Sequence, residues 1–189
     1  NAYRYINFSI SNQFYLICKK QGLDFFKIRN IMKDNYKRNA DIPLAGFTAG
    51  PCLLKDTMQL SAFYNHQFPL FHAAMSINES MPQYIVKKLS DEYNLKKKIV
   101  GVLGLSFKAE NDDIRDSLSI KLLKNLKSKK IKTLQSDEYY KDEKNVDKNE
   151  LIKKSDIIII ATPHKAYKNV KISKNKILVD IWGITQKYI

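Results

Sequence analysis

The apolar residues of this chain follow one period in the first half and another in the second. In residues 1–95 they recur every three or four positions, which is the spacing of helices that bury one face. In residues 96–189 they form short continuous runs separated by helical patterns, which is typical of buried parallel strands. The pattern therefore predicts an α/β chain, with an all-helical domain at 1–95 followed by a parallel α/β domain at 96–189.

Four helices are expected in the first half, at residues 2–21, from 24 to 31 or 32, about 55–64, and 70–95. Gly22 suits the end of the first helix, and Asp24 can cap the second. Pro69 fits the first turn of the last helix, which Pro82 should kink. A loop rich in glycine and proline separates the second helix from the third, and long loops inside compact domains are often functional.

Strands and helices alternate in the expected second half. We expect strands at 98–107, 131–137, 157–162 and 176–183, with helices at 116–129, 148–156 and 163–170. The longest apolar run, Ile157 to Thr162, is far shorter than the roughly 20 residues of a membrane span, so no membrane segment is expected. Ligands of an open parallel sheet bind at the carboxyl ends of the strands, which directs attention to the loop after the first strand.

That loop contains candidate anion-binding residues. Gly101 and Gly104 form a GxxGxS pattern in place of the GxGxxG dinucleotide fingerprint, so an NAD site in this half is not supported. Lys108 and Arg115 lie where the loop opens a helix, and the backbone N–H groups of a helix start favour an anion such as a phosphate or diphosphate. The alternative is that both side chains pair with the three nearby aspartates, and the residues alone leave the two interpretations open.

Cys52 is the candidate nucleophile of the first half. It follows Gly50 in a loop of small residues that lets a ligand approach the backbone, and it lies at or just before a helix start. The helix dipole and Lys55 would stabilise a thiolate, and Asp56 is placed to orient a water or to take a proton. Free cysteines are also often buried small hydrophobes, and no histidine stands beside this one, so both interpretations remain open.

Composition narrows the function classes. The net charge is +14, but the excess is mostly lysine spread along the chain with only four arginines, so nucleic-acid binding is not expected. Two cysteines do not make a disulfide framework, Cys18 is expected in the core, and a reducing, cytoplasmic setting follows. His66, His72 and His164 lack the spacing of metal ligands, so they are interpreted as structural or surface residues and no metal site is expected.

Several stretches, taken together and in this order, resemble the UDP-glucose/GDP-mannose dehydrogenase family of nucleotide-sugar dehydrogenases. They are GFTAGPCLLKDT, INES, VGVLGLSFKAENDDIRDS, DIIIIATPH and ILVDIWG, which cover essentially the whole chain. The resemblance implies a helical middle domain that forms a homodimer, followed by a Rossmann-like α/β domain that binds the nucleotide half of a UDP-sugar. It also implies that NAD is bound by an N-terminal domain absent from this chain. The chain opens without methionine and in a helical pattern, so we expect it to be a portion of a longer protein.

The chemistry that the resemblance implies is a four-electron oxidation of the sugar C6 alcohol to a carboxylate, with two NAD, in polysaccharide biosynthesis. Cys52 would hold the aldehyde level as a thiohemiacetal and then as a thioester, which water hydrolyses. Asp56 matches the aspartate that helps to activate this water, Lys55 completes the family's CxxKD pattern, and Asn1 matches an active-site asparagine. The alternative is a nucleotide-sugar-binding or dimerisation module without catalysis.

The resemblance also assigns residues to the substrate. Gly46, Phe47 and Gly50 would lie along the sugar. Phe107 and Lys108 match a ligand-facing FK pair, and Asp113, Arg115 and Ser117 match a D-x-R-x-S segment. Arg38 matches an arginine that reaches across the dimer. Many members read GFGGxC where this chain has Thr48 and Ala49, and these extra side chains would alter which sugar fits. UDP-glucose and UDP-N-acetylhexosamines both remain open as substrates.

Overall fold

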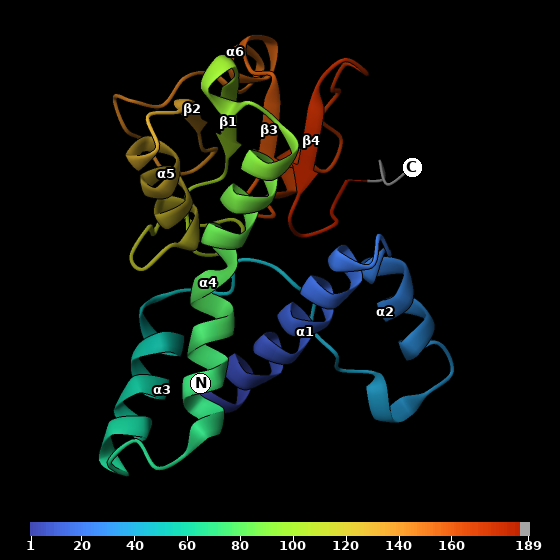
Figure 1. The fold of residues 1–189 in the computed structure, drawn as a ribbon, viewed down its shortest axis with the longest axis vertical. Coiled ribbons are helices and arrows are strands. Elements are labelled where there is room, and N and C mark those ends of the chain that lie inside the picture. Colours follow the sequence, from blue (N-terminus) through green and yellow to red (C-terminus); the bar gives the residue numbers. More distant parts are fainter. Residues whose placement is uncertain (186–189) are drawn as a thin grey trace.

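The computed structural model describes residues 1–185, and Figure 1 shows a helical half and a sheet half joined by one long helix. The helices of the first half are α1 (Ala2–Lys20), α2 (Phe25–Lys33), α3 (Pro51–Phe63) and α4 (Pro69–Glu92), with a 3₁₀ turn at Lys37–Asn39. The long helix α4 packs against α1 and α3 and, in the sheet half, against α5 (Leu118–Ser128). Within the described residues, no helix is long and apolar enough to span a bilayer.

The helix ends follow from the local sequence, with one difference from expectation. Asp24 caps α2 as expected, because its side chain accepts hydrogen bonds from two N–H groups of the first turn. The helix α3 begins at Pro51, before the expected start near Lys55, since a proline at the first helical position needs no N–H partner. Cys52 therefore lies inside the first turn of α3. The helix α4 continues through Pro82.

The second half contains a parallel sheet, as the apolar runs predicted. Its strands are β1 (Ile99–Leu103), β2 (Lys132–Ser136), β3 (Ile157–Ile160) and β4 (Ile177–Asp180), and α6 (Lys148–Lys154) precedes β3. The strand order is β2-β1-β3-β4, with every neighbouring pair parallel. Because the strands run in one direction, the loops that follow β1, β2 and β3 meet at the carboxyl edge of the sheet.

The elements of this half are shorter than expected, and two of these differences shape the carboxyl edge of the sheet. The strand β1 ends at Leu103 and not at Phe107, because Gly104 turns the chain with a φ of 89°. A Cβ at Gly104 would stand 2.4 Å from the Cβ of Thr162, so no larger residue fits there. Where a helix was expected after β3, only a 3₁₀ turn forms, at Lys165–Tyr167. The early end of β1 leaves a long loop at the carboxyl edge, before α5.

One apolar core continues from the helical half into the sheet. Side chains of α4 and α5, among them Ile85 and Leu122, pack with one face of the central strands, represented by Val100 and Ile159. The alternate side chains of the strands form a smaller cluster that includes Leu151 of α6. The two halves share a buried interior, which fixes the loop before α3 relative to the carboxyl edge of the sheet.

The helix α1 buries only part of the face that its apolar spacing indicated. Tyr5, Tyr15 and Cys18 are buried, the last as expected, and the polar Asn12 lies among them. Four large apolar side chains remain exposed, and we call them the α1 stripe: Tyr3, Ile10, Phe14 and Ile17. The spacing predicted the helix correctly but did not identify which apolar positions face the core.

Candidate active site

A cleft of about 600 Å³ opens between the two halves. It is lined from the helical half by Asn1, Arg4, Phe8 and residues 47–53, and from the sheet half by residues 107–109, Asn111, Asp113, Arg115, Pro163 and Trp182. The cleft brings together the loop that leads into Cys52 (residues 46–52, the cysteine loop) and the loop after β1 that carries Lys108 and Arg115, although the two loops lie far apart in the sequence. The two candidate sites predicted from the sequence therefore line one cleft.

Cys52 is exposed and lines the cleft from the start of α3. Gly50 is the N-cap of this helix, so the thiol projects from the first turn, where the N–H groups have no partner within the helix. Arg115 reaches toward it from the other half. The pKa of Arg115 is raised, first by its hydrogen bond to Asp113 and to a smaller extent by the nearby Cys52. The exposure of Cys52 contradicts the interpretation of this residue as a buried small hydrophobe.

Asn1, Lys55 and Asp56 form a polar group beside the cysteine. Nδ2 of Asn1 donates a hydrogen bond of 2.6 Å to Oδ2 of Asp56, and Nζ of Lys55 lies 3.5 Å from Oδ1 of the same carboxylate. The hydrogen bond from Asn1, and then the charge of Lys55, lower the pKa of Asp56. The carboxylate is therefore ionised at neutral pH, one helical turn from Cys52, and can accept a proton from a water.

The loop that leads into Cys52 is anchored by two buried asparagines that the sequence analysis did not assign. Oδ1 of Asn12 accepts the N–H of Gly46 at 2.8 Å, and Nδ2 of Asn12 donates to Oδ1 of Asn78 at 2.8 Å. Nδ2 of Asn78 then donates to the carbonyl oxygen of Tyr5 at 3.1 Å. Asn78 belongs to the INES motif, and these hydrogen bonds give that motif a structural role.

Two glycines of this loop touch aromatic rings of the sheet half. A Cβ on Gly46 would stand 2.4 Å from the Trp182 ring, and one on Gly50 would stand 2.7 Å from the Phe107 ring. Gly50 also has a φ of 119°, which other residues rarely adopt. Gly46 lies beneath Trp182, whereas Phe47 and Gly50 line the cleft. The glycines predicted to follow the sugar thus also allow the two halves to approach closely.

The basic side of the cleft combines one paired and one unpaired cation. Nε and Nη2 of Arg115 donate to the carboxylate of Asp113 at 3.0 and 2.6 Å, as the surface-pair interpretation expected, and the pair still lines the cleft. Lys108 lies over the ring of Phe107, with Nζ 5.5 Å from its centroid. No carboxylate of the described residues forms an ion pair with Lys108, which leaves its charge available to an anion.

Some predicted residues lie outside the cleft, and some cleft residues were not predicted. Arg38 is exposed on the 3₁₀ turn after α2 and does not line the cleft, so its role across a dimer remains a prediction. Trp182 was not assigned to the site, although a single tryptophan directly after the last strand lies at the ligand edge of the sheet. Arg4, Phe8 and Asn111 had no local signal in the sequence.

The histidines lie in two separate places. At the turn between α3 and α4, Nδ1 of His66 lies 3.1 Å from Nε2 of His72, and Oγ of Ser61 lies 3.2 Å from both nitrogens. His164 is fully buried at the carboxyl edge of the sheet. No group of three or more His, Cys, Asp or Glu side chains among residues 1–185 is arranged to hold a metal ion.

Comparison with known proteins relates both halves to one family. The model of the UDP-glucose/GDP-mannose dehydrogenase family, central domain, matches residues 1–80, and the model of the UDP binding domain of the same family matches residues 101–187. The chain belongs to the UDP-glucose/GDP-mannose dehydrogenase family. The resemblance drawn from the ordered motifs is confirmed.

Individual relatives are nucleotide-sugar dehydrogenases of about twice this length or more. The chain is 26% identical to the UDP-N-acetyl-D-mannosamine dehydrogenase of Pyrococcus horikoshii over 95% of its own length and 45% of that protein. It is 32% identical to the UDP-glucose 6-dehydrogenase of Haloferax volcanii, over 67% of its length and 30% of the relative. The solved structure of the Pyrococcus horikoshii UDP-D-ManNAc dehydrogenase matches with a TM-score of 0.86 at 25% identity, over 98% of this chain and 47% of that chain. A UDP-glucose dehydrogenase from Pyrobaculum islandicum shares the fold, with a TM-score of 0.83 at 24% identity over 97% of this chain and 46% of its own.

Proposed function

We propose that this chain is the substrate-holding, thiol-bearing part of a nucleotide-sugar 6-dehydrogenase, which oxidises the sugar C6 alcohol of a UDP-sugar to a carboxylate. The observation that carries the proposal is the single cleft that joins Cys52 to Lys108 and Arg115. The diphosphate of a UDP-sugar suits the two cations, and its sugar end would then reach toward the thiol. The relatives are named for UDP-N-acetyl-D-mannosamine and UDP-glucose, and we propose a substrate of this class.

In the proposed reaction, a first two-electron oxidation converts the C6 alcohol into an aldehyde. The thiolate of Cys52 adds to the aldehyde carbon and forms a C–S bond, and protonation of the aldehyde oxygen gives a thiohemiacetal. Two-electron oxidation at that carbon converts the adduct into a thioester. Water then attacks the thioester carbon, the C–S bond breaks, and the carboxylate leaves while the thiol is restored. Asp56, held by Asn1, takes the proton of this water.

NAD is proposed as the two-electron acceptor, because it accepts hydride, but the residues of this chain do not fit a dinucleotide site. The loop after β1 lacks the GxGxxG pattern. The N–H groups of Leu105 and Ser106, at the position where such sheets hold a pyrophosphate, donate instead to the carboxylate of Asp137. We therefore propose that NAD binds to a part of the enzyme outside this chain, and we assign no hydride transfer step to its residues.

Two measurements test the proposal. Calorimetric titration of the 189-residue chain should show binding of UDP and no binding of NAD. In the complete enzyme, Cys52→Ser should abolish carboxylate formation, because a serine hydroxyl is a far weaker nucleophile than a thiolate. Cys18→Ala, which removes the other and buried thiol, should leave turnover intact. Carboxylate formed at the wild-type rate by Cys52→Ser would rule out the covalent role of Cys52.

A binding module without catalysis is the second candidate for the chain taken alone. The observation in its favour is that the chain contains the cleft and the thiol but spans only about half the length of its relatives. On this reading the isolated chain binds UDP-sugars and produces no NADH. Production of NADH by the isolated chain would contradict it.

We further propose that the chain pairs with a second copy through its helical half, in a cytoplasmic setting. The α1 stripe leaves apolar side chains exposed, and such patches commonly mark protein interfaces. Analytical ultracentrifugation should find a dimer, and Ile10→Asp should shift it toward monomer by placing a charge in the stripe. Gln13→Asp adds the same charge to another exposed position of α1 and should not. A monomeric wild-type chain would contradict the proposal.

A further inference from the structure

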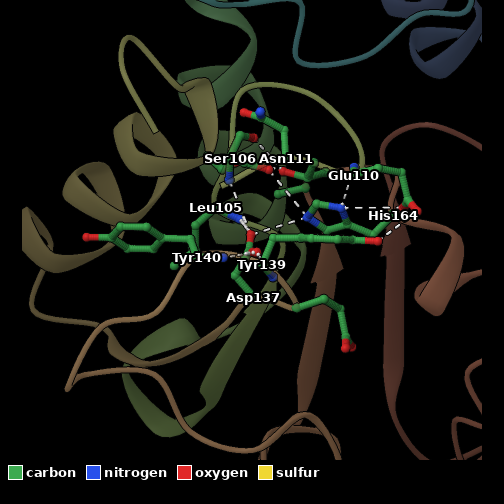
Figure 2. A network of polar contacts seen from close by, with 12 residues as sticks. Leu105, Ser106, Glu110, Asn111, Asp137, Tyr139, Tyr140 and His164 are labelled. Carbon is green, nitrogen blue, oxygen red and sulfur yellow. Dashed lines mark hydrogen bonds and ion pairs between the residues drawn. The ribbon is translucent and has the colours of Figure 1, made fainter. Parts of the chain in front are cut away.

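A buried polar network lies at the carboxyl edge of the sheet, next to the cleft (Figure 2). It joins the ends of three strands, with Leu105 and Ser106 following β1, Asp137 following β2, and His164 following β3. The side chains of Asp137 and His164 are completely buried. The proposed reaction uses neither of them, so their burial and their hydrogen bonds need another explanation.

Asp137 acts as an internal anion within the loop after β1. Its Oδ2 accepts the N–H groups of Leu105 at 2.5 Å and Ser106 at 3.3 Å, and its Oδ1 accepts those of residues 139–140 at 2.8 and 2.9 Å. Burial disfavours the charge, but the hydrogen bonds from His164 and from these N–H groups outweigh it and lower the pKa of Asp137 to about 2. The carboxylate therefore takes the place that a phosphate occupies in dinucleotide-binding sheets.

His164 extends the same network to the far side of the loop. Its Nδ1 accepts the N–H of Glu110 at 3.0 Å, so this nitrogen carries no proton. In the neutral ring the proton is then on Nε2, which lies 3.3 Å from Oδ2 of Asp137 and 3.3 Å from Oγ of Ser106. The Ser106 hydroxyl donates in turn to the carbonyl oxygen of Lys108 at 2.8 Å. Every polar hydrogen of the chain of contacts has an acceptor.

The combination of Ser106, His164 and Asp137 does not form a hydrolytic triad. In a triad, the two ring nitrogens of the histidine contact the serine and the carboxylate separately. Here both groups contact Nε2, and the three side chains are buried away from the cleft. The network is therefore suited to holding the backbone and not to activating a nucleophile.

The anchored positions stand on both sides of Phe107 and Lys108, the two residues that face the cleft. Asp137 accepts the N–H groups of Leu105 and Ser106, and His164 accepts that of Glu110. Glu110 has a φ of 54°, which is uncommon for a residue with a side chain, so this backbone conformation requires support from its surroundings. Without that support, the tip of the loop would be free to leave the cleft.

We infer that Asp137 and His164 are positioning residues, which hold the loop 105–110 so that Phe107 and Lys108 face the nucleotide. The inference rests on the proposed function, because it assigns the cleft to a UDP-sugar. It deepens that proposal by placing control of nucleotide affinity in two side chains that never touch the ligand.

Two substitutions of His164 separate its two hydrogen bonds. In His164→Asn, the amide oxygen takes the place of Nδ1 and still accepts the N–H of Glu110. In His164→Gln, the amide nitrogen takes the place of Nε2 and still donates to Asp137, but the Glu110 N–H loses its acceptor. Calorimetric titration with UDP should give an affinity within about threefold of wild type for the first variant. The second should bind about tenfold more weakly, because its loop is competent only part of the time.

A second readout reports on the loop without any ligand. Hydrogen exchange measured by mass spectrometry should become faster over residues 105–110 in His164→Gln and remain near wild type in His164→Asn. Asp156→Asn is the matched control, because Asp156 also accepts a strand N–H, that of Ile99 at 2.7 Å, but at the amino edge of the sheet. It should lower the melting temperature without changing the affinity for UDP.

The outcomes distinguish this inference from the proposed function. Equal UDP affinities in His164→Asn and His164→Gln would overturn the inference while leaving the proposed function in place. Faster exchange throughout the sheet half of His164→Gln, without an excess at 105–110, would overturn it as well. A wild-type chain that binds no UDP would overturn the proposed function and the inference together.

Discussion

The two loops that line the cleft are held by different chemistry. In the helical half, the loop before α3 is fixed by neutral amides, since Asn12 accepts the N–H of Gly46 and is itself held by Asn78. In the sheet half, the loop after β1 is fixed by the ionised carboxylate of Asp137 and by the imidazole of His164. Amides do not titrate, whereas the carboxylate of Asp137 does. The loop before α3 should therefore keep its anchor at an acidic pH that loosens the loop after β1.

The two anchors also differ in how the chain assembles them. The amide anchor joins α1, the loop before α3 and α4, which meet only through the packing of the helical half. The ionic anchor joins the ends of three neighbouring strands, which any parallel sheet brings to one edge. The first depends on side chains that fit across helices, and the second follows from topology.

The largest expected effect is the loss of the amide anchor. Asn78→Leu removes the acceptor of the Asn12 amide and the donor to the Tyr5 carbonyl oxygen, so buried polar groups lose their partners. The cost should be about 3 kcal/mol in the free energy of unfolding, measured by urea denaturation. Asn30→Leu makes the same change at an exposed position of α2 and should alter stability by less than about 0.5 kcal/mol. Similar costs for the two variants would contradict the anchoring role of Asn78.

The sequence predicted the fold better than it predicted the hydrogen bonds of the amide anchor. The apolar runs identified every strand of residues 1–185, because a parallel sheet buries strands on both faces and leaves a strong signal. The predicted end of β1 was too late, because Gly104 turns the chain and Asp137 then holds the N–H groups of Leu105 and Ser106 outside the strand. That contact is between residues distant in sequence, and no local pattern records it.

The candidate site shows the same division. Cys52, Lys108 and Arg115 were identified because a thiol in a glycine loop and cations at a strand end carry local signals. Asn12 and Asn78 sit in helices as ordinary polar residues, and nothing in their spacing shows that they are buried against each other. Residues that line the cleft with reactive or charged side chains were thus easier to recognise than residues that hold a loop.

The second expected effect is a dependence of stability on acid that only the ionic anchor should show. The pKa of Asp137 is lowered from 3.8 to about 2 on folding. Its contribution to stability is therefore complete above about pH 4 and is lost as the pH falls through about 2. The shift corresponds to roughly 2 kcal/mol. The difference in unfolding free energy between wild type and Asp137→Asn should shrink by that amount between about pH 5 and about pH 2.

Asn78→Leu supplies the matched comparison in acid, because the amide anchor does not titrate. Its difference from wild type should stay constant over the same range, measured by urea denaturation at each pH. A constant difference for Asp137→Asn as well would mean that the Asp137 carboxyl is not held in its charged form. The two anchors would then not differ in their response to protons.

The smallest expected effect concerns the one hydroxyl of the cysteine loop that the amide anchor leaves out. Oγ1 of Thr48 is buried without a hydrogen-bond partner among the described residues, although Thr48 lines the cleft. Thr48→Val keeps the shape of the side chain and removes this oxygen, so stability should change by less than about 0.5 kcal/mol or rise slightly. Thr57→Val is the matched control, because Oγ1 of Thr57 donates to the Leu53 carbonyl oxygen at 2.8 Å, and it should cost about 1 kcal/mol. If Thr48→Val lowers the free energy of unfolding as much as Thr57→Val does, the Thr48 hydroxyl holds the loop together with Asn12. The amide anchor would then be only part of what fixes the loop before Cys52.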